Sequence, residues 1–449
     1  MREKDQALLE RVKQLLEAGS LDQIPDLVRS IHPADVVDIL ENLRDEEQQA
    51  FFHAIPSDTA ADIIQELDPV DQARIIKVMD NVRSSQILKE MDSDDAADLL
   101  ADLPEAKAEK LLGLMNAEGE DVRELLQYDE DSSGGIMATE YVSVRADWTV
   151  EQTLAELRRL APEAETVYYV YVLDEQEHLV GVLSLRDLVI SDLRARIGTI
   201  MNPKVVSVST DVDQEEAAQL FKKYGFLTLP VVDEENKLTG IITADDILDV
   251  VEEEATEDIQ KMAATLPLTE PYLDTGLGTH WTKRVSWLLV LFLAESITGG
   301  ILQKFSAAME AFIALTFFIP LLIDSGGNAG SQAAAIIIRG LAVRDIRVRD
   351  FFRVIWREAW VGLLLGLAMA VVAFFRAWFV GGTPLLGFTV CLAVCAIVAF
   401  GTLVGAALPI IATKIGFDPA VVAGPLITTI VDALGLMIYF TIAKAVLGI

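Results

Sequence analysis

The sequence predicts a multidomain membrane protein: an all-α superhelical amino-terminal domain, a tandem α/β pair of modules, a connecting helix and a five-helix α transmembrane domain. Three observations predict this fold class. The last third of the chain contains five apolar runs, each long enough to cross ~30 Å of hydrocarbon. Acidic residues are concentrated ahead of these runs, and two different sequence repeats fill the acidic part. We expect domains over residues 1–132, 133–195, 196–252, 253–280 and 281–449.

The first repeat consists of short amphipathic helices up to about Met115. Similar apolar cores recur at residues 35–40, 61–67 and 97–103. Proline or aspartate supplies caps and breaks at the helix starts, for example at Pro33. The pattern predicts a helical solenoid, and solenoids commonly present a surface to a partner.

The second repeat covers about residues 134–252. Ile136-Met137 returns 64 residues later as Ile200-Met201, and Leu179–Asp187 matches Leu238–Asp246. A run rich in β-branched residues predicts a central strand in each copy. The two copies resemble a tandem of CBS domains, which are βαβ modules that pair face to face.

The CBS resemblance implies a candidate nucleotide site. In such modules a Ser or Thr three residues before an Asp often holds an adenosine ribose, and Ser184 with Asp187 fits this pattern. Thr243 and Asp246 repeat the pattern in the second copy. Many such pairs act only as dimerisation scaffolds, so ATP binding stays an open alternative. The candidate nucleotide-binding residues are Tyr169 for base stacking, Arg186 for phosphates, Ser184, Asp187 and Phe226.

Charge divides the chain at about Trp281. Residues 1–280 contain 24 Lys+Arg and 61 Asp+Glu, a formal net charge of −37, whereas the remainder carries +4. An acidic part of this kind repels nucleic acid and anionic lipid surfaces, which argues against both as its partners. It attracts cations, although an acidic surface kept for solubility also explains scattered charge. The two cysteines, Cys391 and Cys395, lie in an apolar segment and exclude a disulfide framework.

Acidic residues gather where the second module meets the membrane part and again in the solenoid. Asp249, Glu253 and Glu257 have the i, i+4 spacing of one helix face, where like charges repel unless a cation neutralises them. Hard oxygen ligands without His or Cys favour Mg²⁺, Ca²⁺ or Mn²⁺. A solvated acidic linker is the alternative. The candidate regulatory metal ligands are Asp92, Asp94, Asp95, Asp98, Glu215, Asp246, Asp249, Glu253, Glu254, Glu257 and Asp258.

The membrane part predicts five spans. The second span is too long for one straight helix and contains Pro320 and the glycine-rich stretch 324–332, so we expect a break or bend there. Arginines between the second and third spans, with Lys283-Arg284 before the first, place both loops in the cytoplasm. The amino terminus is then inside and the carboxyl terminus outside a plasma (inner) membrane, and the charged start does not resemble a signal peptide. The expected spans are Val285–Gln303, Ala311–Ile338, Ala359–Phe375, Leu385–Thr413 and Pro419–Ala443.

Asp432 is the only charged side chain in the last apolar run. A carboxylate at mid-membrane depth costs several kcal/mol unless it faces water, a cation or a partner, so it predicts a cation site in a membrane pathway. A buried carboxylate used for helix packing is the alternative. Glu295 lines the path or makes an interhelical hydrogen bond, and we expect Asp324 to cap the broken helix end.

The domain order and the motifs together resemble the MgtE family of magnesium channels over essentially the whole chain. Its motifs match as Pro320 followed by Gly326–Gln332, as Gly424–Asp432, and as Ala255–Asp258. The resemblance implies a homodimer with the pore at the subunit interface and a cytoplasmic part that senses Mg²⁺. Two positions depart from some members: Gly424 stands where an asparagine can line the pore, and Gly225 where a carboxylate can serve a regulatory site. The implied pore set is Asp432 from both chains, Thr428, Thr429, Asn328 and Gly424.

These features predict a Mg²⁺-selective channel or transporter for magnesium uptake. We expect cytoplasmic Mg²⁺ bound to the amino-terminal and CBS domains to close it, with ATP modulation left open. A proton- or sodium-coupled divalent-cation carrier and a membrane-anchored divalent-ion sensor without transport are the alternatives. No enzyme is predicted, because the sequence shows no phosphate loop, nucleophile–histidine pairing or metal-hydrolase spacing. The expected partners are a second copy and the lipid bilayer, without nucleic acid.

Overall fold

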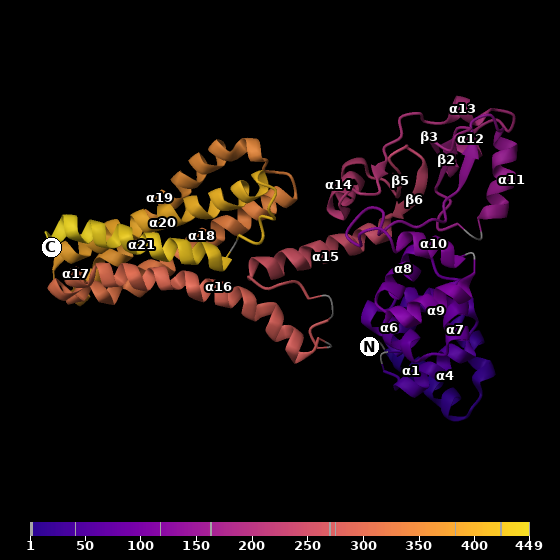
Figure 1. Cartoon of the computed structure of the whole chain (residues 1–449), viewed down its shortest axis with the longest axis horizontal. Helices are drawn as coiled ribbons and strands as arrows, with labels where there is room; N and C mark the ends of the chain where they lie inside the picture. Colours follow the sequence, from indigo (N-terminus) through magenta and orange to yellow (C-terminus); the bar gives the residue numbers. More distant parts are fainter. Residues whose placement is uncertain are drawn as a thin grey trace. The chain divides into compact units, whose positions relative to one another are not determined.

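The computed structural model describes residues 3–448 except 41, 117, 162–163, 269–270, 274, 382 and 423 (Figure 1). The chain forms two compact units, Met1–Glu253 and Glu254–Ile449. The first contains the helical and α/β domains, and the second contains the long apolar helices.

The amino-terminal domain is the predicted all-α superhelix. Its odd-numbered helices pack in one row, α1 on α3, α3 on α5, α5 on α7 and α7 on α9, while α4 packs on α6 and α6 on α8 in a second row. Apolar side chains between the rows form one continuous core. The helices are α1 (Glu3–Glu17), α2 (Ile24–Val28), α3 (Pro33–Leu40), α4 (Asp45–Ala54), α5 (Ser57–Gln65), α6 (Pro69–Val78), α7 (Asn81–Leu88), α8 (Ser93–Ala101), α9 (Glu105–Met115) and α10 (Glu118–Leu125), with the 3₁₀ turn η1 (Leu21–Gln23).

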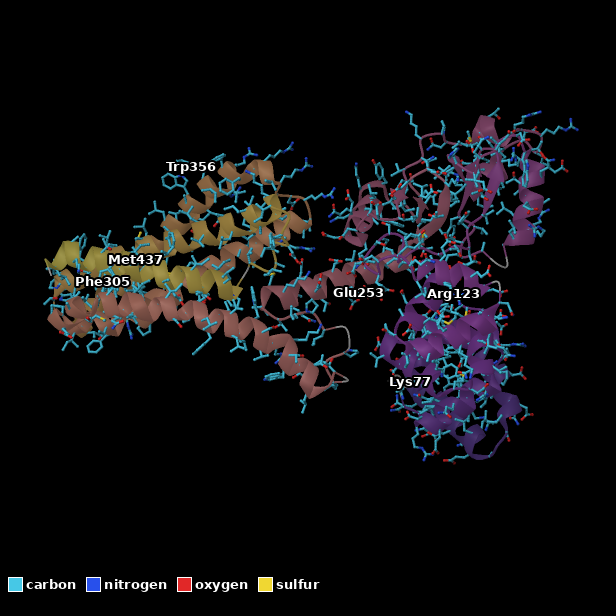
Figure 2. All side chains as sticks on the ribbon, viewed as in Figure 1. Lys77, Arg123, Glu253, Phe305, Trp356 and Met437 are labelled. Atoms are coloured by element: carbon cyan, nitrogen blue, oxygen red, sulfur yellow. The ribbon has the colours of Figure 1, made fainter. Side chains whose placement is uncertain are left out.

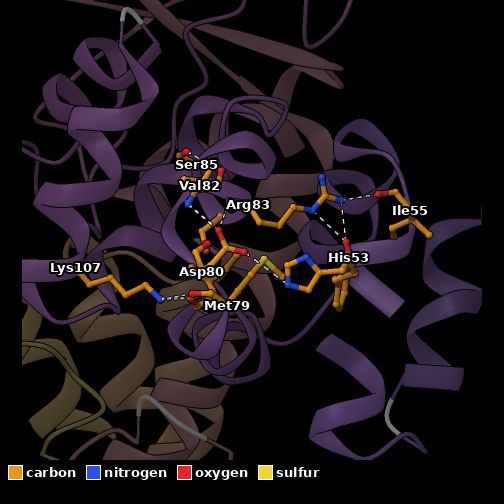
Figure 3. Close-up of polar contacts among 11 residues, drawn as sticks. His53, Ile55, Met79, Asp80, Val82, Arg83, Ser85 and Lys107 are labelled. Atoms are coloured by element: carbon orange, nitrogen blue, oxygen red, sulfur yellow. Dashed lines mark hydrogen bonds and ion pairs between the residues drawn. The ribbon is translucent and has the colours of Figure 1, made fainter. Parts of the chain in front are cut away.

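Two cations stabilise helix ends in this superhelix (Figure 3). Arg83 from α7 donates to the carbonyl of Ile55 at 2.6 Å, just after α4. Lys107 from α9 donates to the carbonyls of Lys77 at 2.8 Å and Met79 at 3.2 Å, at the end of α6. The last carbonyls of a helix lack intrahelical partners and carry the negative end of its dipole. In both cases a cation binds the end of the helix that lies three helices earlier in the chain, and this contact joins successive repeats.

The α/β modules are two copies of one three-stranded sheet. In each copy the first strand is parallel to the second, and the second is antiparallel to the third. The registers agree, with Tyr169 opposite Ser184 in one sheet and Thr228 opposite Thr243 in the other. The elements are β1 (Ser143–Arg145), α11 (Val150–Leu160), β2 (Tyr169–Leu173), β3 (Leu179–Ser184) and α12 (Leu185–Ile190), then α13 (Ile197–Ile200), β4 (Val208–Ser209), α14 (Gln214–Tyr224), β5 (Thr228–Val232), β6 (Leu238–Thr243) and α15 (Ala244–Met262).

The repeated Ile-Met segments connect the two modules crosswise. Ala138, beside the first segment, pairs with Ile241 of the second sheet, and Asn202, beside the second, pairs with Val182 of the first sheet. A Cβ added at Gly181 would meet the sulfur of Met201 at 2.3 Å, so glycine is required for this close approach. The motif found in the sequence therefore holds the modules together.

The connecting helix lies earlier in the chain than the expected range 253–280. Helix α15 begins inside the second module and continues without interruption to Met262. The next helix, α16, begins only at Leu277. The helix ends at Met262 because Ala264 has a positive φ of 55°, outside the helical region.

The second unit contains five helices that, among the described residues, are long and apolar enough to cross a membrane: 277–304, 313–342, 348–380, 384–414 and 424–447. Helix α20 packs against α18, α19 and α21, and α16 packs against α21 (Figure 1). The elements are α16 (Leu277–Lys304), α17 (Ser306–Ala311), the 3₁₀ segment η2 (Ile313–Phe318), α18 (Ile319–Ala342), the 3₁₀ turn η3 (Val348–Asp350), α19 (Phe351–Gly381), α20 (Pro384–Lys414) and α21 (Gly424–Leu447).

The expected break at the glycine-rich stretch of the second span does not occur. Helix α18 is continuous through residues 324–332, and the irregular part is η2, which ends just before Pro320 in the first turn of α18. Asp324 therefore lies within the helix and does not cap a broken end, contrary to the prediction.

Close helix packing explains why the glycines do not interrupt α18. A Cβ added at Gly401 of α20 would meet the carbonyl oxygen of Gly326 at 2.4 Å, and one at Gly405 would meet that of Gly330 at 2.0 Å. Small residues four apart on both helices thus let the two backbones touch, as in membrane helix pairs of this type. The glycines of α18 therefore allow close packing against α20 and do not form a turn.

Candidate functional site

Helix α21 presents one polar stripe. Gly424, Thr428 and Asp432 have i, i+4 spacing, which places them on one helix face, and all three are partly exposed. The hydroxyls of Thr428 and Thr429 donate to the carbonyl of Pro425 at 2.8 and 3.0 Å. Each hydroxyl oxygen retains lone pairs that can accept hydrogen bonds from a hydrated cation.

Helix α18 presents a second polar stripe. Asp324, Asn328 and Gln332 again have i, i+4 spacing, and all three are exposed, while the glycines and alanines of the opposite face are buried. A Cβ added at Gly327 would meet the Cγ2 atom of Thr428 at 3.0 Å, so the two stripes lie on helices in direct contact. Gln332 was not among the predicted site residues, and the i, i+4 spacing from Asp324 was the signal that marks it.

Three intramembrane carboxylates come from three helices. Glu295 lies on α16, Asp324 on α18 and Asp432 on α21. Both Glu295 and Asp324 are exposed in the single chain. Among the described residues, no three His, Cys, Asp or Glu side chains converge closely enough to hold a metal ion by themselves. A cation on this path would therefore be bound through its water shell or with a second copy of the chain.

The soluble unit contains a group of one buried and three partly buried carboxylates, which we call the acidic core: Asp94, Asp95, Glu165 and Asp246. Asp94 is only 8 % exposed. Burial raises the pKa of Asp94 well above its usual range, and the negative charges of Asp246 and Asp95 raise it further. Burial, followed by the charges of Asp92 and Asp246, likewise raises the pKa of Glu165. The fold thus brings together acidic side chains that have reduced access to water.

The acidic core joins three separate segments. Asp94 and Asp95 begin α8, Asp246 begins α15, and Glu165 precedes β2. Burial also raises the pKa values of Asp95 and Asp246. One oxygen of Glu165 is buried without a hydrogen-bond partner. In the described part of the chain, no lysine or arginine forms an ion pair with these four residues. An oxygen-only set with uncompensated charge attracts a hard divalent cation, but these side chains do not converge closely enough to hold the ion without its own water ligands.

Polar contacts align α8 with the segment before the first sheet. Ser93 donates to Glu140 at 2.8 Å and accepts from the backbone N–H of Thr139 at 2.9 Å. Gln65 donates to Asp92 at 2.7 Å and to Asp95 at 2.6 Å. Sequence reasoning missed Glu140 and Glu165, because neither lies in an acidic run and only the fold brings them to α8.

The remaining predicted regulatory ligands lie outside the acidic core. Asp98, Asp249 and Glu253 are exposed. Glu215 accepts from Gln219 at 3.2 Å at the start of α14. Glu254 and Asp258 lie on α15 beyond the boundary of the first unit.

Glu257 was expected among free metal ligands but is engaged in an ion pair. Lys261, one turn later on α15, places its Nζ atom 2.6 Å from Glu257 and 2.8 Å from Asp418. Asp418 also accepts from the backbone N–H of Ala420 at 2.7 Å. This links the end of α15 to the segment between α20 and α21.

A cleft of about 480 Å³ in the first α/β module contains most of the predicted nucleotide residues. Asp187 is not among the residues that line it, but it accepts from the Ser184 hydroxyl at 2.6 Å, which fixes that hydroxyl. Phe226 does not line the cleft and stacks on Tyr224 with ring centres 5.2 Å apart. The lining residues are Tyr168, Tyr169, Ser184, Leu185, Arg186, Val189, Ile190 and Leu227.

Comparison with known proteins gives consistent matches along the chain. The chain matches the family profile MgtE, described as a divalent cation transporter, over residues 319–442. It also matches the MgtE intracellular N domain over 31–131 and the CBS domain over 133–193 and 197–253.

Curated relatives match over full length. The magnesium transporter MgtE of Thermus thermophilus is 44% identical over 447 residues, covering 99% of each chain. That of Bacillus subtilis is 34% identical over 439 residues, covering 98% of this chain and 97% of the relative.

Solved structures match the soluble unit. A crystal structure of the cytosolic domain of the Mg²⁺ channel MgtE in complex with ATP has a TM-score of 0.52 and 43% identity, covering 54% of this chain and 99% of that one. The soluble part of a magnesium transporter has a TM-score of 0.54 and 33% identity, covering 56% and 99%.

Proposed function

Since this chain belongs to the MgtE family of divalent cation transporters, we propose that it conducts Mg²⁺ across the plasma membrane along a path lined by Asp432. The observation that carries this proposal is the pair of polar stripes on the contacting helices α18 and α21. Mg²⁺ gives up its water reluctantly, so hydroxyl and amide oxygens such as those of Thr428 and Asn328 accept hydrogen bonds from its water shell. Asp432 supplies the negative charge that attracts the ion.

A second copy of the chain completes the path in this proposal. Asp324, Asn328 and Gln332 are exposed in the single chain, at a depth where polar groups facing lipid are costly. A homodimer that covers these faces removes that cost and brings a second Asp432 to the path. The paired carboxylates then select a doubly charged ion over singly charged ones.

The acidic core is proposed as the regulatory site. Two unit charges about 6 Å apart repel by roughly 3 kcal/mol at an effective dielectric near 20, so a few such pairs shift a two-state equilibrium. Bound Mg²⁺ would neutralise Asp94, Asp95, Glu165 and Asp246. Without that compensation, the four carboxylates drive α8 away from the start of α15, which is how scarcity of Mg²⁺ opens the path in this proposal.

The cleft of the first α/β module is proposed to bind ATP. Tyr169 offers a ring for base stacking, and the Ser184 hydroxyl, fixed by Asp187, faces the same cleft as Arg186. The planar guanidinium group of Arg186 carries several N–H donors, which suit it to binding phosphates. The solved relative with ATP supports this assignment.

The arginine-rich loop between α18 and α19 supports a cytoplasmic location for that loop and for the soluble unit. With five crossings the carboxyl terminus is outside. Transport, without catalysis, is the activity proposed.

Flux into proteoliposomes tests this function. The wild type is expected to admit Mg²⁺ without any proton or sodium gradient, and Asp432→Asn to lower that flux at least about tenfold, because one charge of the path is removed from each chain. Asp345→Asn, an exposed loop carboxylate in the same unit, is the matched control and should leave flux unchanged. Flux only under an imposed gradient would support a coupled carrier instead, and no flux under any condition would support a sensor.

A further inference from the structure

A pocket of about 420 Å³ lies between the start of α19 and the end of α20, apart from the ion path. Its floor is apolar and its two charged residues are both basic. The lining residues are Val348, Arg349, Phe351, Phe352, Ile410, Ile411 and Lys414.

The positive charge of the pocket is uncompensated within the chain. Arg349 and Lys414 are exposed, and neither forms an ion pair with any other described residue. Arg353 and Arg357 follow Arg349 at intervals of four residues, which continues the basic face along the first turns of α19. The site therefore attracts an anion that also has apolar parts.

Exposed aromatic rings show that the pocket opens at the membrane interface. Phe352, Trp356 and Trp360 are 83%, 67% and 53% exposed and follow one another every four residues along α19. Figure 2 shows Trp356 directed away from the helix bundle. Tryptophan rings beside arginines are typical of the level of lipid headgroups.

The pocket lies at the end of the transmembrane unit that receives the connecting helix. Lys414 ends α20, and Asp418, four residues later, forms the ion pair with Lys261 of α15. A ligand at Lys414 would thus lie beside the segment to which the connecting helix is attached.

We propose that this pocket binds one anionic phospholipid. Its phosphate lies between Arg349 and Lys414, and its acyl chains run over Phe351, Phe352 and Ile410. Basic pockets between transmembrane helices at a headgroup level bind acidic lipids in this manner. Free phosphate would not contact the apolar floor of the pocket. A zwitterionic lipid would not neutralise the positive charges of Arg349 and Lys414. The proposal concerns binding and does not depend on which ion the chain transports.

Lipid retention by the purified full chain tests the proposal. The chain in detergent is mixed with phosphatidylglycerol or phosphatidylcholine of identical acyl chains, and bound lipid is counted by native mass spectrometry. The wild type is expected to retain phosphatidylglycerol selectively. Arg349→Gln with Lys414→Gln should lower that retention roughly 10- to 30-fold, since each cation near a headgroup contributes to binding an acidic lipid.

Three controls make the result decisive. The double variant Lys304→Gln with Arg376→Gln removes the same amount of charge near the carboxyl-terminal ends of α16 and α19, away from the pocket. It should retain the lipid as the wild type does. Arg349→Lys with Lys414→Arg should restore binding, which separates charge from folding. Millimolar inorganic phosphate should not displace the lipid. Equal retention of both lipids, displacement by phosphate, or undiminished phosphatidylglycerol binding by Arg349→Gln with Lys414→Gln would each overturn the proposal, and the last result would mean that the lipid is held elsewhere on the chain.

Discussion

Lys261 Nζ lies 2.8 Å from Asp418 Oδ2, so the last turn of α15 is attached to the segment just before α21. Burial lowers the pKa of Lys261, but hydrogen bonds with Asp418 and Glu257 outweigh it and raise the pKa overall. Lys261 is therefore protonated at physiological pH. A second contact lies beside it: Gly424 has a φ of +39°, and an added Cβ would meet the Met262 carbonyl at 2.6 Å.

Breaking the ion pair is expected to weaken closure of the path by Mg²⁺. Lys261→Gln leaves Asp418 and Glu257 without their shared cation, and loss of one partner of a partly buried pair costs about 1–2 kcal/mol. The Mg²⁺ concentration that halves flux in proteoliposomes should then rise about tenfold. Lys261→Arg should behave like the wild type, and Lys283→Gln, a cation at the start of α16, is the charge control. An unchanged Mg²⁺ dependence in Lys261→Gln would show that the attachment has no role in closure.

Gly424→Ala should also weaken closure of the path by Mg²⁺, here because of a steric clash. The new methyl group would contact the Met262 carbonyl, and the left-handed backbone angle is unfavourable for alanine. Because both substitutions disturb one contact region, their effects on half-inhibition by Mg²⁺ should be less than additive in the double variant. Fully additive effects would mean that the two contacts act independently.

The acidic core predicts a pH dependence of local stability in the absence of divalent ions. The pKa of Asp94 is raised in the folded state, so its stabilising contribution is complete below the unfolded value near 4 and is lost as pH rises through the folded value. Protection of α8 from hydrogen exchange, corrected for intrinsic rates, should therefore fall from pH 5 to pH 8 in chelator.

Asp94→Asn should weaken this dependence, and Asp95, Glu165 and Asp246 should keep the remainder. An amide keeps the shape without the charge, so α8 should be more protected at pH 8 by on the order of 2–4 kcal/mol, and added Mg²⁺ should protect it less than in the wild type. Asp35→Asn, at the start of α3 and outside the acidic core, is the matched control. Equal Mg²⁺ protection in Asp94→Asn and the wild type would place the regulatory ion elsewhere.

The sequence pattern predicted those features that depend on local periodicity. The superhelix, the duplicated sheets and the five apolar helices follow from repeats and hydropathy, and the matching registers of β2–β3 and β5–β6 agree with the repeat at Leu179–Asp187. The glycine-rich stretch of α18 was misinterpreted because glycine predicts a turn only when no second backbone packs against it. Here Gly401 and Gly405 supply that backbone.

Contacts between segments far apart in the chain could not be predicted from the sequence. Glu140 and Glu165 reach α8 only through the fold, and the pair of Lys261 with Asp418 joins residues 157 positions apart. The expected end of the connecting helix was wrong because no proline or glycine marks Met262. Counting charges along the sequence located the acidic runs, but it could not predict which of their residues are buried.

The polar stripe on α18 predicts graded effects on flux. Asp324→Asn should lower Mg²⁺ flux less than Asp432→Asn does, roughly three- to tenfold, because Asp324 lies on α18, which contacts α21, and its charge adds attraction for the cation. Glu310→Gln, outside the helices α16 and α18, is the charge control. The reduction should shrink at high salt if Asp324 faces water. A loss as complete as that of Asp432→Asn would instead make Asp324 a direct ligand of the ion.

The nucleotide cleft predicts a specific loss of ATP binding. Arg186 is the one cation among the residues that line the cleft, so Arg186→Gln should weaken ATP binding to the full chain about tenfold or more, measured by calorimetry. Binding of adenosine, which has no phosphates, should change much less, whereas Tyr169→Ala should weaken both ligands because it removes the stacking surface. Arg194→Gln, an exposed arginine in the same module but outside the cleft, controls for net charge. Equal losses for ATP and adenosine in Arg186→Gln would assign this residue to the shape of the cleft and not to phosphate recognition.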